Sequence, residues 1–194
     1  MKEIEILSAL EGLGWRCDKD EAGDYFCLMD IGEVQIQIIP TIGKRSDHFR
    51  VSLIPSVSTK NFTAAVAFVL GEASNYVPII VSNDVPEKIV DFSLDDVVRL
   101  SQSAISWASA QDIEKGLAAY RALPTSSKGA MPLRHLAALA IAGDVSCLAN
   151  YQFSFEQGDR LGFVPYINQD MIERALLIAR NVGSIKGTDL FSLL

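Results

Sequence analysis

The spacing of apolar residues divides the chain into an N-terminal part of mixed helices and strands and a C-terminal part of helices alone. Near the start, Ile4, Leu7 and Leu10 recur at steps of three, which predicts a helix over residues 2–12. Residues 34–38 then alternate between apolar residues and glutamines, as is typical of a half-buried antiparallel strand. Similar short runs at 15–17, 25–30, 33–40 and 48–57 predict a meander of three or four strands.

Capping residues place two further helices in the N-terminal part. Thr59 is a plausible N-cap for a helix that ends at Leu70, before Gly71. Ser93 precedes a pair of aspartates and is expected to cap a helix that reaches residue 108. Residues 76–81 and 88–92, which lie between these helices, are strand-like. The predicted element order over residues 1–110 is therefore α-β-β-β-α-β-β-α.

The remainder of the chain, residues 111–194, shows helical patterns only. Helices are predicted at 112–123, 132–142, 146–157 and from 168 onward, and the tail GTDLFSLL is expected to be mobile unless Phe191 and Leu194 dock. A helical unit of this size is marginal on its own. We therefore expect an α+β fold with an antiparallel meander sheet and flanking helices at 1–110. The helical extension at 111–194 is expected to pack on it as one cooperative unit.

The net charge of −7 lies entirely in the N-terminal part. Residues 1–110 hold 9 Lys and Arg against 16 Asp and Glu, whereas residues 111–194 hold 8 of each. This balance argues against nucleic-acid binding, which needs a basic surface, and favours a partner protein that is itself basic.

Length and composition also bear on where the chain acts. The 194 residues are 49% hydrophobic, enough for a packed core, yet no apolar run reaches the roughly 18 residues of a membrane span. The N-terminus has no basic segment followed by an apolar block, so it is not a signal peptide. We expect a cytoplasmic protein that does not enter a membrane.

The residues that carry catalytic or metal chemistry are sparse. Cys17 and Cys27 flank a predicted hairpin, and we favour core packing for them over a reversible disulfide or a metal site with His48. His135 is expected to be a surface histidine or one with satisfied hydrogen bonds. Gly43-Lys44 lacks the upstream glycine of a phosphate-binding loop and is expected to form a hairpin turn. No cofactor, metal or catalytic residue is predicted.

Two sets of residues are candidates for contact with a partner. The densest acidic cluster covers a hairpin and the next turn, and it favours either a solvated hairpin or a docking surface for a basic protein, with weak cation binding as a further alternative. Aromatic residues beside an arginine in the loop 158–167 form either an interface anchor or packing against the sheet. The candidates are Asp18, Asp20, Glu21, Asp24, Asp30, Glu33, Arg160, Phe163 and Tyr166.

Several segments of the N-terminal part carry a resemblance to a known fold. They are LSALEGLGW, DKDEAGDYFCLMD, EVQIQIIP, DHFRVSLIPSV, and FTAAVAFVLGE before YVPIIVS. Their order resembles the type III secretion chaperone-like fold, including the YbjN-type proteins, over somewhat more than half of the chain. The resemblance implies a fold that binds other proteins and implies no enzymatic activity. The small, acidic build is also similar to that of bacterial immunity proteins, which cap a toxin.

The sequence as a whole favours a non-enzymatic protein-binding module. The first hypothesis is an immunity protein that binds and neutralises a cognate toxin through an acidic surface. The alternatives are a secretion chaperone or adaptor for an effector segment, which predicts a homodimer in solution, and an enzyme of unrecognised type.

Overall fold

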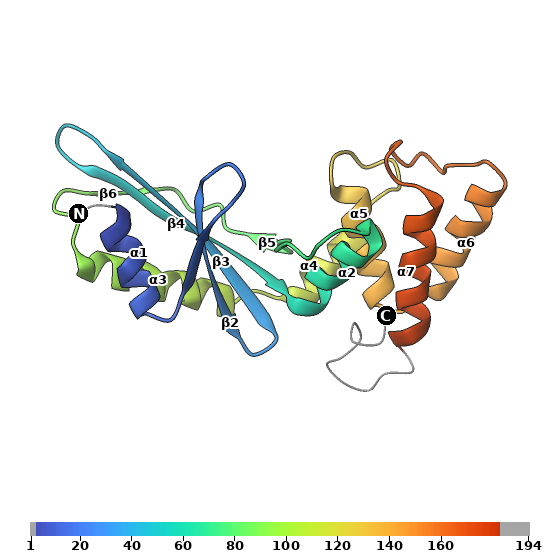
Figure 1. Ribbon diagram of the computed structural model, residues 1–194, viewed down its shortest axis with the longest axis horizontal. Helices are drawn as coiled ribbons and strands as arrows, with labels where there is room; N and C mark the ends of the chain where they lie inside the picture. The colour runs from blue at the N-terminus through green and yellow to red at the C-terminus, as the bar shows by residue number, and fades with distance from the viewer. Residues whose placement is uncertain (1–2, 183–194) are drawn as a thin grey trace. The chain divides into compact units, whose positions relative to one another are not determined.

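The protein consists of two compact units. The computed structural model (Figure 1) describes residues 3–182, and the tail with Phe191 and Leu194 lies outside them. The first unit comprises the chain up to Ser58 together with Pro78–Asp112, and the second comprises Thr59–Val77 and the chain from Ile113 onward. An antiparallel sheet with flanking helices is followed by further helices, which confirms the predicted α+β class.

The first unit is built on a six-stranded sheet. Strands β1 to β5 are hydrogen-bonded in chain order, and β6 also pairs with β4. Four strands, β1 to β4, precede the helix at Lys60–Leu70, whereas the predicted element order has three strands at this place. The elements of this unit are α1 (Glu3–Gly12), β1 (Arg16–Lys19), β2 (Tyr25–Ile31), β3 (Val34–Lys44), β4 (Phe49–Thr59), β5 (Ile80–Val81), β6 (Glu87–Ile89) and α3 (Leu94–Ser109).

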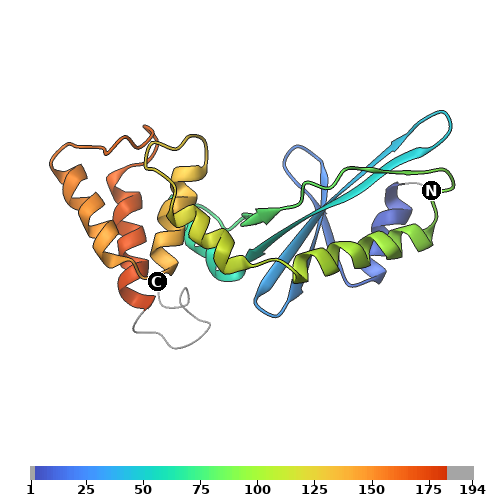
Figure 2. The same cartoon turned by 180° about the vertical axis from the view of Figure 1, so that it is seen from behind.

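Helices α1 and α3 pack on each other, and α3 also contacts β3 of the sheet (Figure 2). Trp15, which is only 2% exposed, joins the layers because its indole N–H donates to the Ser101 hydroxyl of α3 at 2.8 Å. As predicted, Ser93 begins α3, and the side chain of Asp96 accepts from the Ser93 backbone N–H in a capping box. Of the apolar face expected for α1, Leu7 and Leu10 are buried in the core of this unit, whereas Ile4 is 67% exposed.

Strand β5 is much shorter than the strand predicted at 76–81. It pairs with β4 only where Ser56 faces Val81 and Val57 faces Ile80. The predicted residues 76–79 would face β4 beyond Val57, where the strand ends at Thr59 and the helix at Lys60–Leu70 begins, so little of the strand is left for them to pair with. Periodicity alone cannot detect this limit.

The second unit is helical and discontinuous in sequence. Its helices are α2 (Lys60–Leu70), α4 (Ile113–Arg121), α5 (Met131–Ile141), α6 (Val145–Glu156) and α7 (Gln169–Val182). The last four confirm the helices predicted in the C-terminal part. Helix α2, however, packs against α5 and α7, so the expected division at residue 110 differs from the structure by one helix. Within residues 3–182, no helix is long and apolar enough to span a membrane.

Arg174 of α7 holds the end of α2 in this helical unit. Its guanidinium donates to the backbone carbonyls of Val69 at 2.9 Å and Leu70 at 3.2 Å, which are acceptors left over at a helix C-terminus. Gly71 ends α2 at φ +81°, and a Cβ there would lie 3.3 Å from the guanidinium. The close approach and the left-handed backbone therefore both require glycine at this position.

We expect Arg174→Met to lower the free energy of unfolding by about 2 kcal/mol, because two carbonyls lose charged donors. Urea denaturation followed by circular dichroism measures the change. Arg180→Met, an exposed substitution on the same helix, is the matched control and should change stability by less than about 0.5 kcal/mol. Equal effects of the two substitutions would contradict the assigned role.

The pairing of Val57 with Ile80 makes a second prediction possible. Because residues 58 and 79 flank this pair, a short Gly-Ser turn can replace residues 59–77 without opening the sheet. A fragment 1–112 with this replacement should give a dispersed amide spectrum by NMR. The same fragment with residues 59–77 retained should aggregate, since the buried face of α2 (Phe62, Val66, Val69) lacks α5 and α7. A soluble, monomeric fragment that retains α2 would contradict the assignment of α2 to the helical unit.

Candidate functional site

The acidic candidates at the start of the sheet lie on the β1–β2 hairpin. The two strands pair from Arg16 with Leu28 to Lys19 with Tyr25, and residues 20–24 form the turn. The Asp20 carboxylate accepts from the backbone N–H groups of Ala22 and Asp24, both at 2.9 Å. Asp20 is therefore used by the turn itself, as is typical of an Asx turn.

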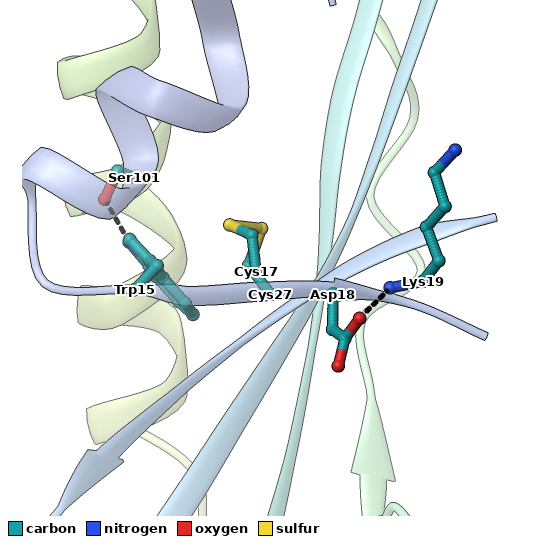
Figure 3. The surroundings of a disulfide bond; sticks show 6 residues. All are labelled: Trp15, Cys17, Asp18, Lys19, Cys27 and Ser101. Carbon is teal, nitrogen blue, oxygen red and sulfur yellow. Dashed lines mark hydrogen bonds between the residues drawn. A yellow bond between two sulfur atoms is a disulfide. The ribbon is translucent and has the colours of Figure 1, made fainter. Parts of the chain in front are cut away.

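A disulfide between Cys17 and Cys27 fixes the hairpin below this turn (Figure 3). The two residues face each other across β1 and β2 with 4.0 Å between their Cα atoms, and Cys27 is fully buried. The core-packing interpretation of these cysteines was incomplete, because they are bonded to each other as well as buried. The less favoured alternative from the sequence, a disulfide, is the one that the structure contains.

Four exposed carboxylates project from this short hairpin. They belong to Asp18, Asp20, Glu21 and Asp24, which we call the acidic hairpin. The one cation among residues 18–24 is Lys19, whose ammonium lies 4.4 Å from the centre of the Tyr25 ring. The side chains of Asp18 and Lys19 point away from each other in Figure 3, while the Asp18 carboxylate accepts from the Lys19 backbone N–H at 2.8 Å. The segment therefore presents an excess of negative charge on a backbone held by a turn and a disulfide.

Asp30 and Glu33 do not join the acidic hairpin. They lie at the opposite end of β2, and its seven residues at about 3.3 Å each separate the two groups by about 20 Å. Asp30 is already engaged, since its carboxylate pairs with Arg16 at 3.4 Å and accepts from the Gln35 amide at 3.2 Å. The single acidic cluster predicted from the sequence is thus divided into two groups.

In the second candidate set, Arg160 organises its own loop. Its guanidinium donates to the backbone carbonyls of Val164 at 3.1 Å, Pro165 at 3.2 Å and Ile167 at 2.6 Å, and it lies over the Phe155 ring. These contacts close the segment between α6 and α7. All three of these bonds come from one nitrogen of Arg160, Nη2.

The aromatic members of this set have different surroundings. Phe163 is 4% exposed and packs edge-on against Tyr151 and Phe155, so it is a core residue of the helical unit. Tyr166 is 43% exposed, and its hydroxyl donates to the carbonyl of Gly129 at 3.0 Å. Of these two aromatic residues, Tyr166 is the one exposed enough to contact a partner.

His135 is buried with both ring nitrogens engaged. Nδ1 lies 2.9 Å from the Tyr120 carbonyl, which can only accept, so this nitrogen carries the proton, and Nε2 accepts from the Tyr151 hydroxyl at 3.1 Å. Burial lowers the pKa of His135 and keeps the ring neutral. This satisfied histidine agrees with one of the two alternatives expected from the sequence.

The remaining candidates from the sequence have structural surroundings. Lys44 ends β3, and the Arg45 N–H donates to the His48 carbonyl at 2.8 Å, which confirms the predicted hairpin turn. His48 Nδ1 lies 2.7 Å from the Asp47 carboxylate, and this hydrogen bond lowers the pKa of Asp47. Across the described part of the chain, no group of three or more His, Cys, Asp and Glu could hold a metal ion.

Sequence reasoning missed the importance of the disulfide, although a signal for it was present. Cys17 and Cys27 are placed symmetrically about the Asp20–Asp24 turn, so any regular hairpin register centred there pairs them. Arg174, by contrast, gives no local signal, because its partners lie more than 100 positions away.

Reduction of the disulfide should lower the free energy of unfolding by about 2–3 kcal/mol, the chain-entropy value for a loop of about ten residues. Urea titrations of the oxidised and the reduced protein measure the difference. Cys147→Ser, which removes the free cysteine, is the control and should preserve the full effect. Identical midpoints before and after reduction would show that the link does not stabilise the hairpin.

Comparisons with known proteins give one result at the level of family. No curated protein and no solved structure matches the chain. A model of a family of unknown function, DUF6990, matches residues 2–180, which is nearly the whole length. The chain therefore belongs to the DUF6990 family.

Proposed function

We propose that the protein is a non-enzymatic binding module that captures a basic partner protein through the acidic hairpin. The observation that carries the proposal is the combination of four exposed carboxylates with a backbone fixed by the Cys17–Cys27 disulfide and the Asp20 turn. A preorganised loop loses little conformational freedom on binding, so more of the contact energy contributes to affinity.

The chemistry of the hairpin defines the kind of partner. Clustered carboxylates attract lysine and arginine and accelerate the encounter with a positively charged surface. A toxin that acts on nucleic acid needs such a surface to hold phosphates. In the concrete form of the proposal, the hairpin covers the basic surface of a cognate bacterial toxin and keeps the substrate away.

The first experiment identifies the partner. The tagged full-length chain is used as bait in native lysate at low and at moderate salt, and bound proteins are identified by mass spectrometry. The proposal expects one stoichiometric, basic, folded partner whose recovery falls as salt rises. Capture of several extended secreted segments by a homodimer would replace it with the chaperone alternative.

We expect Glu21→Lys combined with Asp24→Lys to slow association with the purified partner by about tenfold at low salt. The dependence of the association rate on ionic strength should also become weaker. Stopped-flow fluorescence over a salt series measures both. Asp20 is left unchanged because the turn needs it.

The matched control is Glu72→Lys with Glu156→Lys. It makes the same change in net charge at two exposed positions of the helical unit. If both variants slow association equally, the net charge acts rather than the hairpin. If neither does, the acidic hairpin has no part in recognition.

The location of the protein stays a prediction. Disulfides are typical of oxidising compartments, whereas the sequence favours the cytoplasm. Alkylation of thiols at the moment of cell lysis shows which form of Cys17 and Cys27 the native cell contains.

A further inference from the structure

Strand β4 has a gap in its pairing on the side of β5 and β6. It pairs with β6 at residues 49–51 and with β5 at Ser56 and Val57, and the four residues between have no register partner in either strand. The Pro55 carbonyl accepts from the Ser82 N–H at 2.9 Å, so the missing N–H of Pro55 lies on this same side. Proline thus explains why the ladder stops here.

The chain that crosses this gap lines one side of a half-open cavity of about 330 Å³ in the first unit. Its walls come from residues 51–55 of β4, from residues 84–87 of the β5–β6 connection and from α3. Val51, Leu53, Leu100 and Ala104, each less than 9% exposed, supply its apolar lining. This volume lies within the range of small-molecule sites.

Ser52 gives the cavity an unusual polar group. The residue is 8% exposed, and within residues 3–182 its hydroxyl has no hydrogen-bond partner. Its oxygen exposes less than 1 Å² to solvent, so a molecule in the cavity reaches this hydroxyl only if neighbouring groups shift.

The two carboxylates of the lining, Glu87 and Asp84, differ in whether a cation pairs with them. Glu87 is neutralised by Arg99, which donates to both of its oxygens at 2.7 and 3.1 Å. Asp84 is exposed, and no described cation pairs with its carboxylate; only its backbone N–H is engaged, by the Ser82 hydroxyl. The lining therefore combines one uncompensated negative charge, one buried hydroxyl and an apolar surface.

We propose that this cavity binds a small organic monocation with an alkyl body. The cationic group pairs with Asp84, and the alkyl part lies against Leu53 and Leu100. The site shares no residue with the acidic hairpin, so this proposal does not depend on the proposed function.

Two isosteric probes test the proposal on the full-length protein. n-Butylguanidinium carries the charge, whereas n-butylurea has the same shape without it. Both are titrated to about 20 mM, as the weak binding of an eight-atom ligand requires, and amide shifts are followed by NMR. The cation should shift residues 51–55, 84–87 and 100–104, and n-butylurea should bind at least tenfold more weakly.

Three variants sharpen the test. Asp84→Asn should weaken binding of the cation about tenfold, and Ser103→Trp, at an exposed position of the lining, should abolish it. Asp91→Asn, which removes an exposed carboxylate outside the lining, is the control and should leave affinity unchanged.

Three outcomes would overturn the proposal. The first is an absence of shifts at the lining residues over the whole titration. The second is equal binding of the cation and n-butylurea. The third is equal weakening by Asp84→Asn and Asp91→Asn, which would indicate general attraction to a negative protein.

Discussion

The short pairing of β4 with β5 is the constraint on which the division of the chain depends. Two residue pairs, Ser56 with Val81 and Val57 with Ile80, join the strands on either side of residues 59–77, the segment that leaves the first unit. Thr59 ends β4 and at once caps α2, so the strand passes into the helix without a loop. The apolar face of α2 then packs in the core of the helical unit, where the rings of Phe62 and Tyr120 stack with 5.6 Å between their centroids. The helical unit is therefore built from two separate stretches of sequence.

Both candidate sites of the first unit lie where the regular ladder of the sheet stops. β1 is only four residues long and forms one edge, where the acidic turn continues beyond the last pair of the hairpin. Charged edge strands also resist pairing with other chains, so the same carboxylates have a structural use. On the side of β5 and β6, Pro55 interrupts the pairing, and a cavity takes the place of the missing bonds. A ladder that stops thus leaves room for polar groups that a continuous sheet would cover.

Local patterns predicted most of the elements, and long-range contacts decided the rest. Thr59, Gly71 and Ser93 mark the ends of α2 and α3 because capping involves residues within one turn. The same patterns show which face of α2 is apolar but not what covers it, so the sequence alone predicts α2 as part of the unit that contains the sheet. The extent of β5 depends on where β4 ends, at Thr59, which lies more than 20 positions before Ile80. These differences all arise from pairing between distant segments, which periodicity does not contain.

In the candidate site too, the composition of the sequence identifies residues, whereas their arrangement follows only from the structure. Asp18, Asp20, Glu21 and Asp24 are exposed on the predicted hairpin, but β2 separates them from Asp30 and Glu33, and Arg16 engages Asp30. The loop with Arg160 and Phe163 has the composition of an interface, yet its arginine donates to its own carbonyls and its phenylalanine is buried. What distinguishes the acidic hairpin is that its carboxylates remain exposed while its backbone is fixed. Charge that is exposed and held in place can steer a partner at little entropic cost, and this is the physical reason to look for recognition there.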